Sequence, residues 1–324
     1  PGNAYVTDLR DKKHGRIYRV VYGEEVAPFS LENASSEKLV DALSDSNMFW
    51  RRHAQRLLIE NGESDMIPSL TELVRVRRLD QIGLDPGAIH ALHTLNSLGY
   101  LSTKAGRKLL GEALSHPSSG VVRTAIEVLP RDAQSRDTLL ESEAEGSGNG
   151  QVLLSRLLAL AEMPPSQQSA AAALEVLTEG RHSRDRWMLD AATSAAANSG
   201  GEFLSLACRV AEPTTSLENA LQIVSEHVAR SEDIPAIAKT MPELLDANPA
   251  IRRAVVQGWS NGWPRDARAK LPSDADDQLV EVFQRLGAGG KGQLIRLADA
   301  WGSKRLAENA KMIAKSLGEI ARNE

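Results

Sequence analysis

The sequence predicts an all-α protein, an α-α superhelix or solenoid of stacked helical hairpins that follows a short N-terminal β-hairpin. Of its 324 residues 42% are hydrophobic but only 4% are aromatic, so the apolar material is mostly small and aliphatic, which suits thin helical layers. A small residue recurs at intervals of roughly 34 residues, the period typical of stacked helical hairpins. Beyond about residue 30, no segment shows the alternating pattern that predicts a strand.

Residues 1–30 differ from the rest of the chain. Ala4–Asp8 and Gly15–Tyr22 have the β-branched and aromatic alternation of strands, and the polar segment Asp11–Gly15 separates them. An isolated hairpin is only marginally stable in water, so these strands should belong to a larger sheet. We therefore divide the chain into a β-strand remnant, residues 1–30, and a helical repeat domain, residues 31–324.

The repeat unit begins at a leucine, crosses a turn of small residues, and enters a helix with an apolar-Arg-x-Ala pattern. Three clear copies are Leu43–Ala54, Leu114–Ala125 and Leu245–Ala254, and weaker copies fill the intervals. The recurring small residue lets neighbouring helices approach closely, while flanking leucine and valine fill the layer between them. It stands at Ala54, Ala91, Ala125, Ala159, Ala191, Ala220, Ala254 and Ala298.

Helix ends are marked by capping residues. Asp45–Asn47, Ser115–Ser118 and Asp246–Pro249 supply side-chain acceptors or a proline where the second helix of a repeat should begin. Glu145–Gly150 predicts a flexible loop near the middle of the array, and Ser303–Arg322 predicts a long amphipathic helix. Glycines are expected to end four helices, at Gly62, Gly99, Gly180 and Gly200.

Charged residues recur at equivalent positions of the repeats. Because such positions lie one above another in a stacked array, we expect either a polar ladder that ties the repeats together or a basic stripe that faces a partner. The ladder is the interpretation we favour. The residues concerned are Asp45, Arg51, Arg52, Arg123, Asp246, Arg252 and Arg253.

Three other patterns are predicted to be structural. Gly287–Gly292 resembles a phosphate-binding loop but lacks its first glycine, and no Ser or Thr follows Lys291, so we expect a flexible turn between two helices. His90 and His93 share a helix face without a third ligand nearby, which argues against a metal site. Asp274–Asp277 lacks the glycine and final glutamate of a calcium loop and predicts an acidic first helical turn.

Charge and cysteine content exclude further functions. The chain has 38 Lys and Arg against 43 Asp and Glu, so it lacks the basic surplus of a nucleic-acid-binding protein, and we do not expect nucleic acid as a partner. The single cysteine, Cys208, lies in an apolar segment and predicts a small buried side chain. One cysteine excludes an intrachain disulfide and the C-x-x-C-H motif of attached haem. No apolar run is long enough to span a membrane.

We predict no catalytic, cofactor-binding or metal-binding residue, and no enzymatic activity of this chain alone.

The sequence nevertheless resembles known repeats. The apolar-Arg-x-Ala helices from about Ser35 to Ala300 look like HEAT and other armadillo-like repeats. Tyr5–Asp8 with Gly15–Val20 resembles the last strands of a sugar-dehydrogenase-like β-propeller, and Leu43–Leu58 follows as the first repeat helix does in large planctomycete-type membrane-bound dehydrogenases. In that family the propeller precedes HEAT-like repeats and a C-terminal haem-binding C-x-x-C-H module.

This resemblance implies an extracytoplasmic dehydrogenase, periplasmic or secreted, of which the chain is the middle part. The chain begins at Pro1 and not at a methionine, so we expect a processed product or a fragment. Its partners would be the propeller and cytochrome c-like module of the parent protein, with another protein as a further partner. The alternatives are an autonomous HEAT-like protein that binds another protein or nucleic acid, and a HEAT-like lyase.

Overall fold

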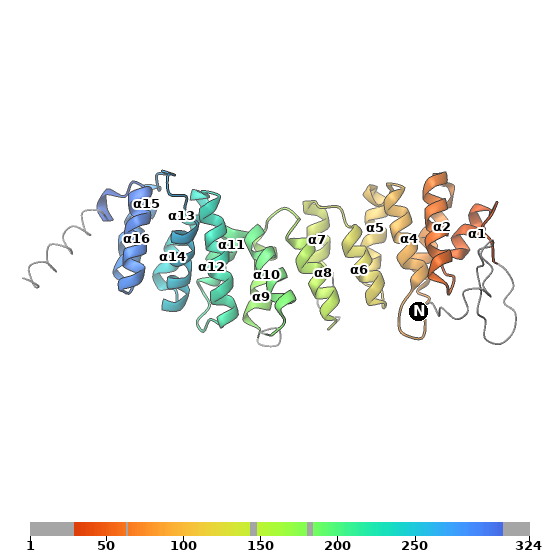
Figure 1. Cartoon of the computed structure of the whole chain (residues 1–324), viewed down its shortest axis with the longest axis horizontal. Helices are drawn as coiled ribbons and strands as arrows, with labels where there is room; N and C mark the ends of the chain where they lie inside the picture. Colours follow the sequence, from red (N-terminus) through yellow and green to blue (C-terminus); the bar gives the residue numbers. More distant parts are fainter. Residues whose placement is uncertain (1–28, 63, 143–147, 180–183, 307–324) are drawn as a thin grey trace, which may run out of the picture.

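The computed structural model describes residues 29–62, 64–142, 148–179 and 184–306, and within these ranges the chain is all-α, without a strand. The helices follow one another along the long axis of an elongated molecule (Figure 1). Both strands expected within residues 1–30 lie outside the described residues, which begin at residue 29. So do the first half of the expected central loop (residues 145–147), the helix end predicted at Gly180, and all but the start of the expected C-terminal helix.

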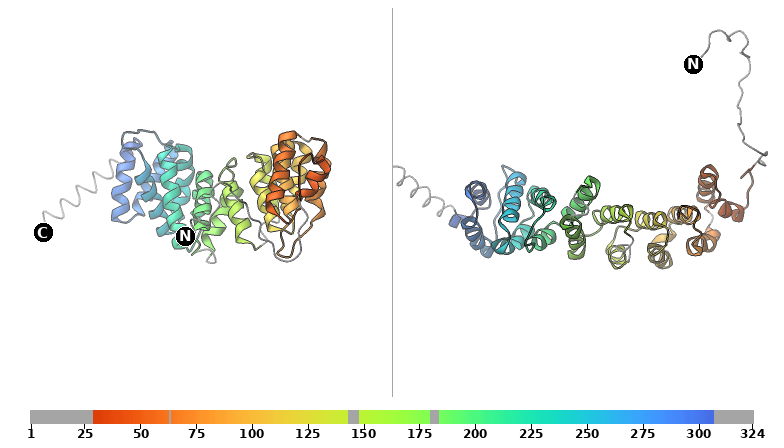
Figure 2. Two further views of the ribbon diagram at one scale, coloured as in Figure 1. Left: turned by 45° about the vertical axis from the view of Figure 1, so that its right-hand side comes forward. Right: turned by 90° about the horizontal axis from the view of Figure 1, so that it is seen from below.

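The helices form two layers, which are visible when the chain is viewed from below (Figure 2). One layer, the even row, consists of helices that each pack on the next even-numbered helix. Its members are α2 (Met48–Asn61), α4 (Pro86–Ser97), α6 (Ser119–Val128), α8 (Gly150–Leu160), α10 (Arg186–Asn198), α12 (Thr215–Arg230), α14 (Pro249–Gly262) and α16 (Ala288–Ala300).

The other layer, the odd row, alternates with the even row along the chain. Its members are α3 (Ile67–Val76), α5 (Lys104–Leu114), α7 (Ala133–Glu141), α9 (Gln167–Thr178), α11 (Gly200–Ala207), α13 (Ile234–Asp246) and α15 (Ser273–Gln284). Helix α1 (Ser36–Ala42) packs on α2 at the N-terminal end of the described array, and short 3₁₀ turns occupy Ser64–Met66 and Tyr100–Ser102. No helix in the described ranges has the length and apolar character that crossing a bilayer demands.

The recurring alanines lie in the even row. Each of the eight even-numbered helices contains one of them, and every one is buried, with at most 6% of its surface exposed. A methyl side chain at these positions allows neighbouring helices to approach closely, and leucines and valines fill the rest of the layer. Each recurrence of the small residue in the sequence therefore marks one helix of the even row, from Ala54 in α2 to Ala298 in α16.

The odd row is less uniform. Helices α9, α11, α13 and α15 pack directly one on the next, whereas α7 makes little direct contact with α9. Helix α7 buries only Ser135 and Leu139. The odd row is therefore open between α7 and α9.

Several predicted helix ends are confirmed. The Asn47 side chain accepts a hydrogen bond from the Phe49 N–H at the start of α2, and Asn248 caps α14 with Pro249 as its first residue. Gly62 ends α2 with a φ of 67°, a left-handed conformation that glycine adopts without strain. Ser118 precedes α6 as its N-cap residue but makes no side-chain capping bond.

Two predicted interruptions of helices, a helix end at Gly200 and a turn at Gly287–Gly292, are wrong. Gly200 does not end a helix: it is the buried first residue of α11, which follows α10 directly through Ser199. Gly287–Gly292 does not form a flexible turn but begins α16, with Gly287 as the capping residue. Burial of Leu294, Leu297 and Ala298 further along this helix outweighs the low helix propensity of its glycines.

Candidate functional site

Arg51, one of the residues expected to form a ladder, bonds to the backbone of the turn before α2. Its Nη1 donates to the carbonyl oxygens of Asp45, at 2.6 Å, and Ser46, at 3.0 Å, and its Nε donates to Nε2 of His90 at 3.4 Å. The Asp45 carboxylate accepts from the backbone N–H of Asn47, in its own turn. Arg51 thus closes the turn before α2 and reaches α4, but it does not pair with the Asp45 carboxylate.

Arg252 has a similar role at the other end of the array. It is buried, and its guanidinium donates to the carbonyl oxygens of Leu244, Leu245 and Ala247, where α13 ends, at 2.8 to 3.0 Å. It also donates to the carbonyl oxygen of Arg285, in the next repeat. A cation is favoured at a helix C-terminus because the carbonyl ends carry a partial negative charge.

The other expected ladder residues lie at the surface. Asp246 pairs with Arg285 at 3.2 Å, and Arg253 pairs with Glu218 of α12 at 3.3 Å, so each contacts an adjacent repeat. Arg52 and Arg123 are exposed. The structure therefore brings the predicted arginines together with backbone carbonyls or glutamates, and not with the two predicted aspartates as a single ladder.

Ion pairs between adjacent repeats are more frequent than the sequence pattern suggested. Most join residues that stand 25 to 39 positions apart, close to one repeat length. These pairs do not form a pattern in the sequence, because the number of residues between the two partners varies, although it stays near the repeat length. Besides Arg253–Glu218 and Arg285–Asp246, the pairs are Arg75–Glu112, Arg107–Asp132, Arg131–Glu162, Lys239–Glu202, Arg209–Glu243 and Arg305–Asp277.

His90 of α4 and the single cysteine are both held among packed helices. His90 Nδ1 lies 2.6 Å from Oε1 of Gln55, and burial, with the nearby Arg51 cation, lowers the pKa of His90 to about 4. Burial raises the pKa of Cys208 to about 12, which keeps the thiol protonated. The described residues contain no group of three or more His, Cys, Asp or Glu side chains with metal-binding geometry.

A buried titratable pair that the sequence analysis did not single out joins α4 to α6. Asp85 caps α4 through its Oδ1, and its Oδ2 lies 3.7 Å from Nε2 of His116. His116 Nδ1 accepts the backbone N–H of Ser118, the residue before α6. Because both side chains are almost fully buried between helix ends, they connect two repeats and do not offer an accessible acid–base pair.

Helix α7 is held by polar contacts on two sides, the first of them to α5. Asp132, the capping residue of α7, accepts two hydrogen bonds from Arg107 of α5, with oxygen–nitrogen distances of 3.1 and 2.7 Å. Arg107 and the Ser135 backbone N–H, which bonds to the same carboxylate, lower the pKa of Asp132 to about 2. This bidentate ion pair fixes the start of α7 relative to α5.

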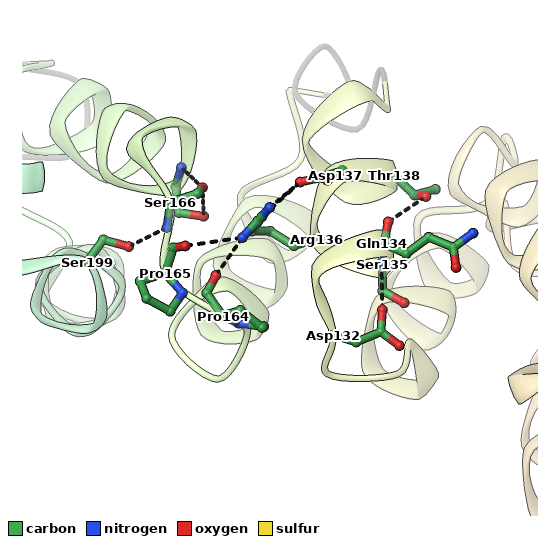
Figure 3. Close-up of polar contacts among 11 residues, drawn as sticks. Asp132, Gln134, Ser135, Arg136, Asp137, Thr138, Pro164, Pro165, Ser166 and Ser199 are labelled. Carbon is green, nitrogen blue, oxygen red and sulfur yellow. Dashed lines mark hydrogen bonds and ion pairs between the residues drawn. The ribbon is translucent and has the colours of Figure 1, made fainter.

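On its other side, α7 is tied to the loop before α9 (Figure 3). Arg136 Nη1 donates to the carbonyl oxygens of Pro164 and Pro165, each at 3.1 Å, and the same guanidinium pairs with Asp137. Ser166, the next residue, caps α9, and its backbone N–H donates to the hydroxyl oxygen of Ser199 at 3.2 Å. Prolines have no N–H, but their carbonyls are strong acceptors, so one arginine bridges the gap between α7 and α9.

Two grooves lie beside α7, one on each side. The groove between α5 and α7 has a volume of about 770 Å³, and we call it the basic groove, because its charged residues are all cationic: Lys104, Arg107 and Lys108. Its remaining lining comes from Ala105, Gly111, Leu129, Gln134, Ser135 and Thr138. Lys104 and Lys108 are both exposed; among the described residues Lys104 forms no ion pair, whereas Lys108 Nζ lies 4.0 Å from a carboxylate oxygen of Glu112 in the same helix.

The groove between α7 and α9, which we call the acidic groove, has a volume of about 580 Å³. Asp137, Glu141 and Glu175 outnumber its one cation, Arg136. Leu140, Ala171 and Ala172 supply apolar surface. Helix α7 therefore separates two surfaces of opposite charge.

The chemistry of the grooves suits binding better than bond-making. A serine nucleophile needs a base within hydrogen-bonding distance, but the Ser135 hydroxyl accepts from the Arg107 guanidinium at 3.1 Å and is buried. The other lining groups are lysine and arginine cations, carboxylates, the amides of Gln134 and Gln168, the hydroxyl of Thr138, and aliphatic side chains. None of these groove residues was predicted, because the grooves depend on helix spacing and not on a local motif.

Comparison with protein-family models and with curated proteins found no match to this chain.

Proposed function

We propose that the chain is a non-catalytic interaction module, a HEAT-like α-α superhelix that holds a segment of another protein in the grooves beside α7. The observation that carries the proposal is the pair of grooves of opposite charge on the two sides of one helix. A groove with an apolar floor and charged walls can bury apolar side chains of a partner and select for its charge.

The geometry favours a partner segment that presents carboxylates to the basic groove. Lys104 and Lys108 lie on one face of α5, one turn apart, and the N-terminal ends of α5 and α7 add partial positive charge. Leu129 and Ala105 offer apolar surface between the cations. An amphipathic helix with glutamates beside leucines has the complementary chemistry.

The resemblance of the N-terminal segment and the first repeat helix to planctomycete-type dehydrogenases suggests where such a partner would come from. In a protein of that kind, the module would join a propeller to a cytochrome c-like module outside the cytoplasm. We propose this setting, in which the chain is a spacer that also docks a neighbouring domain, for the whole protein.

The test uses a synthetic amphipathic peptide with Glu and Leu at helical spacing, and a second peptide in which Lys replaces each Glu. Binding is measured by fluorescence anisotropy for the unmodified chain and for the double variant Lys104→Glu with Lys108→Glu. A third protein, Lys270→Glu, is the matched control, because Lys270 is an exposed lysine outside the basic groove.

We expect the acidic peptide to bind the unmodified chain and the Lys270→Glu control, and to lose affinity for the double variant. Because attraction between exposed charges is screened by salt, binding should weaken as ionic strength rises. Equal affinity of the acidic and basic peptides, or equal loss in the control, would contradict the assignment of the groove.

A further inference from the structure

A pocket of about 400 Å³ lies at the other end of the described array, between the C-terminal ends of α14 and α16. Its lining includes three arginines, Arg265, Arg268 and Arg296, together with Ser260, Asn261 and Asp299. All three arginines are exposed. The pocket is remote in sequence from the α7 grooves and is independent of the function proposed for them.

The loop that carries two of these arginines is anchored at several points. The Trp263 indole N–H donates to the carbonyl oxygen of Ala267 at 3.3 Å, and the Ala269 N–H donates to the carbonyl oxygen of Ala300, the last residue of α16, at 3.0 Å. Trp263 is buried and packs edge-to-face on Trp301, with ring centres 5.5 Å apart. The arginines are therefore presented by a loop of fixed shape.

The charge of the pocket is unbalanced. Three guanidinium groups face one carboxylate, that of Asp299, which leaves a formal charge of +2 among the lining residues. Within the described part of the chain, none of the three arginines forms an ion pair, whereas Arg209, Arg253 and Arg285 of the same half each pair with a carboxylate. Arg268 donates to two loop carbonyls, and Arg296 approaches the Ser260 hydroxyl at 3.4 Å.

The position of the pocket explains why these cations can gather without a carboxylate partner. Helices α14 and α16 both end there, and the partial negative charge of helix C-termini attracts cations. An arginine has five N–H donors, so the bonds that Arg268 and Arg296 already make leave donors for a ligand. Repulsion among the guanidinium groups would fall when an anion enters.

We propose that this pocket binds the phosphate group of a small organic phosphate. A phosphate monoester carries a charge of about −1.5 to −2 at neutral pH, opposite in sign to the formal charge of the lining side chains. Guanidinium groups bind phosphate oxygens in pairs, with a planar geometry that a lysine does not provide. The volume falls in the range of small-molecule sites, about 300–1,000 Å³, so the pocket also has room for part of the organic body.

The test is isothermal titration calorimetry with phenyl phosphate as the probe, and with inorganic phosphate and benzoate for comparison. The variants Arg265→Gln and Arg296→Gln each remove one pocket cation at an exposed position. Arg78→Gln is the matched control, because Arg78 is also exposed and lies near the start of the array. Thermal unfolding of each variant verifies that the fold is unchanged.

We expect one phenyl phosphate per chain, with an affinity that falls about tenfold in each pocket variant and stays unchanged in Arg78→Gln. Inorganic phosphate should compete, and benzoate should bind more weakly. No binding at millimolar phenyl phosphate, an equal loss in the Arg78→Gln control, or benzoate binding as tight as phenyl phosphate would overturn the proposal. Binding of a single-stranded oligonucleotide without binding of phenyl phosphate would overturn the assignment to a small molecule.

Discussion

Substitution of one buried glycine in α14 tests how closely the even row is packed. A Cβ atom added at Gly258 would lie 2.6 Å from the Ser225 Cβ and 3.0 Å from the Glu226 backbone nitrogen, both in α12. One turn later, a Cβ at Gly262 would lie 2.8 Å from the Glu226 carbonyl carbon. Real side chains do not approach backbone atoms this closely, so Gly258→Ala requires α12 and α14 to move apart.

The expected magnitude follows from two opposing effects. Alanine is favoured over glycine inside a helix by about 0.5–1 kcal/mol, whereas forcing extra atoms into a packed layer typically costs about 1–3 kcal/mol. The obstacle at Gly258 includes backbone, which cannot rotate away as a side chain can. We therefore expect Gly258→Ala to lower the free energy of unfolding by about 2 kcal/mol.

Gly292 is the matched control for the same chemical change. It lies inside α16, and a Cβ there would meet no atom within 4 Å. Gly292→Ala should therefore raise the free energy of unfolding by about 0.5–1 kcal/mol, through helix propensity alone.

Urea unfolding followed by tryptophan fluorescence measures both changes. Trp259, the residue after Gly258, is fully buried beside Trp301, with ring centres 6.0 Å apart, so its emission reports on the packing of α14. The two variants should shift the urea midpoint in opposite directions. A Gly258→Ala variant as stable as the Gly292→Ala variant would refute the close approach of α12 and α14.

Two further predictions concern titratable groups. Burial lowers the pKa of His90 to about 4, so its neutral form stabilises the fold above the unfolded pKa of 6.5 and this contribution is lost as the pH falls towards 4. By about pH 5 the free energy of unfolding, measured with urea, should have fallen by about 2 kcal/mol through this group. The His90→Gln variant should lack this part of the decrease. An identical decrease with pH in both proteins would contradict the prediction. Because burial raises the pKa of Cys208 to about 12, a thiol reagent at neutral pH should label it only after urea unfolding, and stoichiometric labelling of the folded chain would disprove its burial.

Features that depend on local sterics were predictable from the sequence. The eight alanines were found because a small side chain is required wherever neighbouring helices approach, so the requirement repeats with the structure. The caps at Asn47 and Asn248 were found because capping uses residues adjacent in sequence. Gly287–Gly292 was misjudged because burial further along α16 decides its conformation, and propensity alone does not report that burial.

The candidate sites were not predictable, for a different physical reason. The basic and acidic grooves exist because α7 is separated from α9 while it remains tied to α5, and no single segment encodes that separation. The arginine positions were identified as important, but a pattern does not distinguish the buried Arg252, which binds carbonyls, from its exposed neighbour Arg253. Orientation around a helix decides the difference.

The polar contacts between repeats help to explain why a partner would bind beside α7. Exposed ion pairs contribute only about 0–1 kcal/mol each, so the stability of the array rests on its buried apolar layer, and the pairs chiefly set how one repeat is placed on the next.

Among the described residues, pairs of this kind link α3 to α5 and α11 to α13, but none links α7 to α9, where Arg136 bonds instead to two proline carbonyls. A partner that spans these helices can therefore pair with Asp137, Glu141 or Glu175 without displacing an ion pair between repeats. The basic groove offers the same advantage through Lys104, for which no ion pair occurs in the described ranges, whereas Arg107 stays committed to Asp132. Binding beside α7 would thus add contacts between repeats at the point where the odd row has fewest of its own.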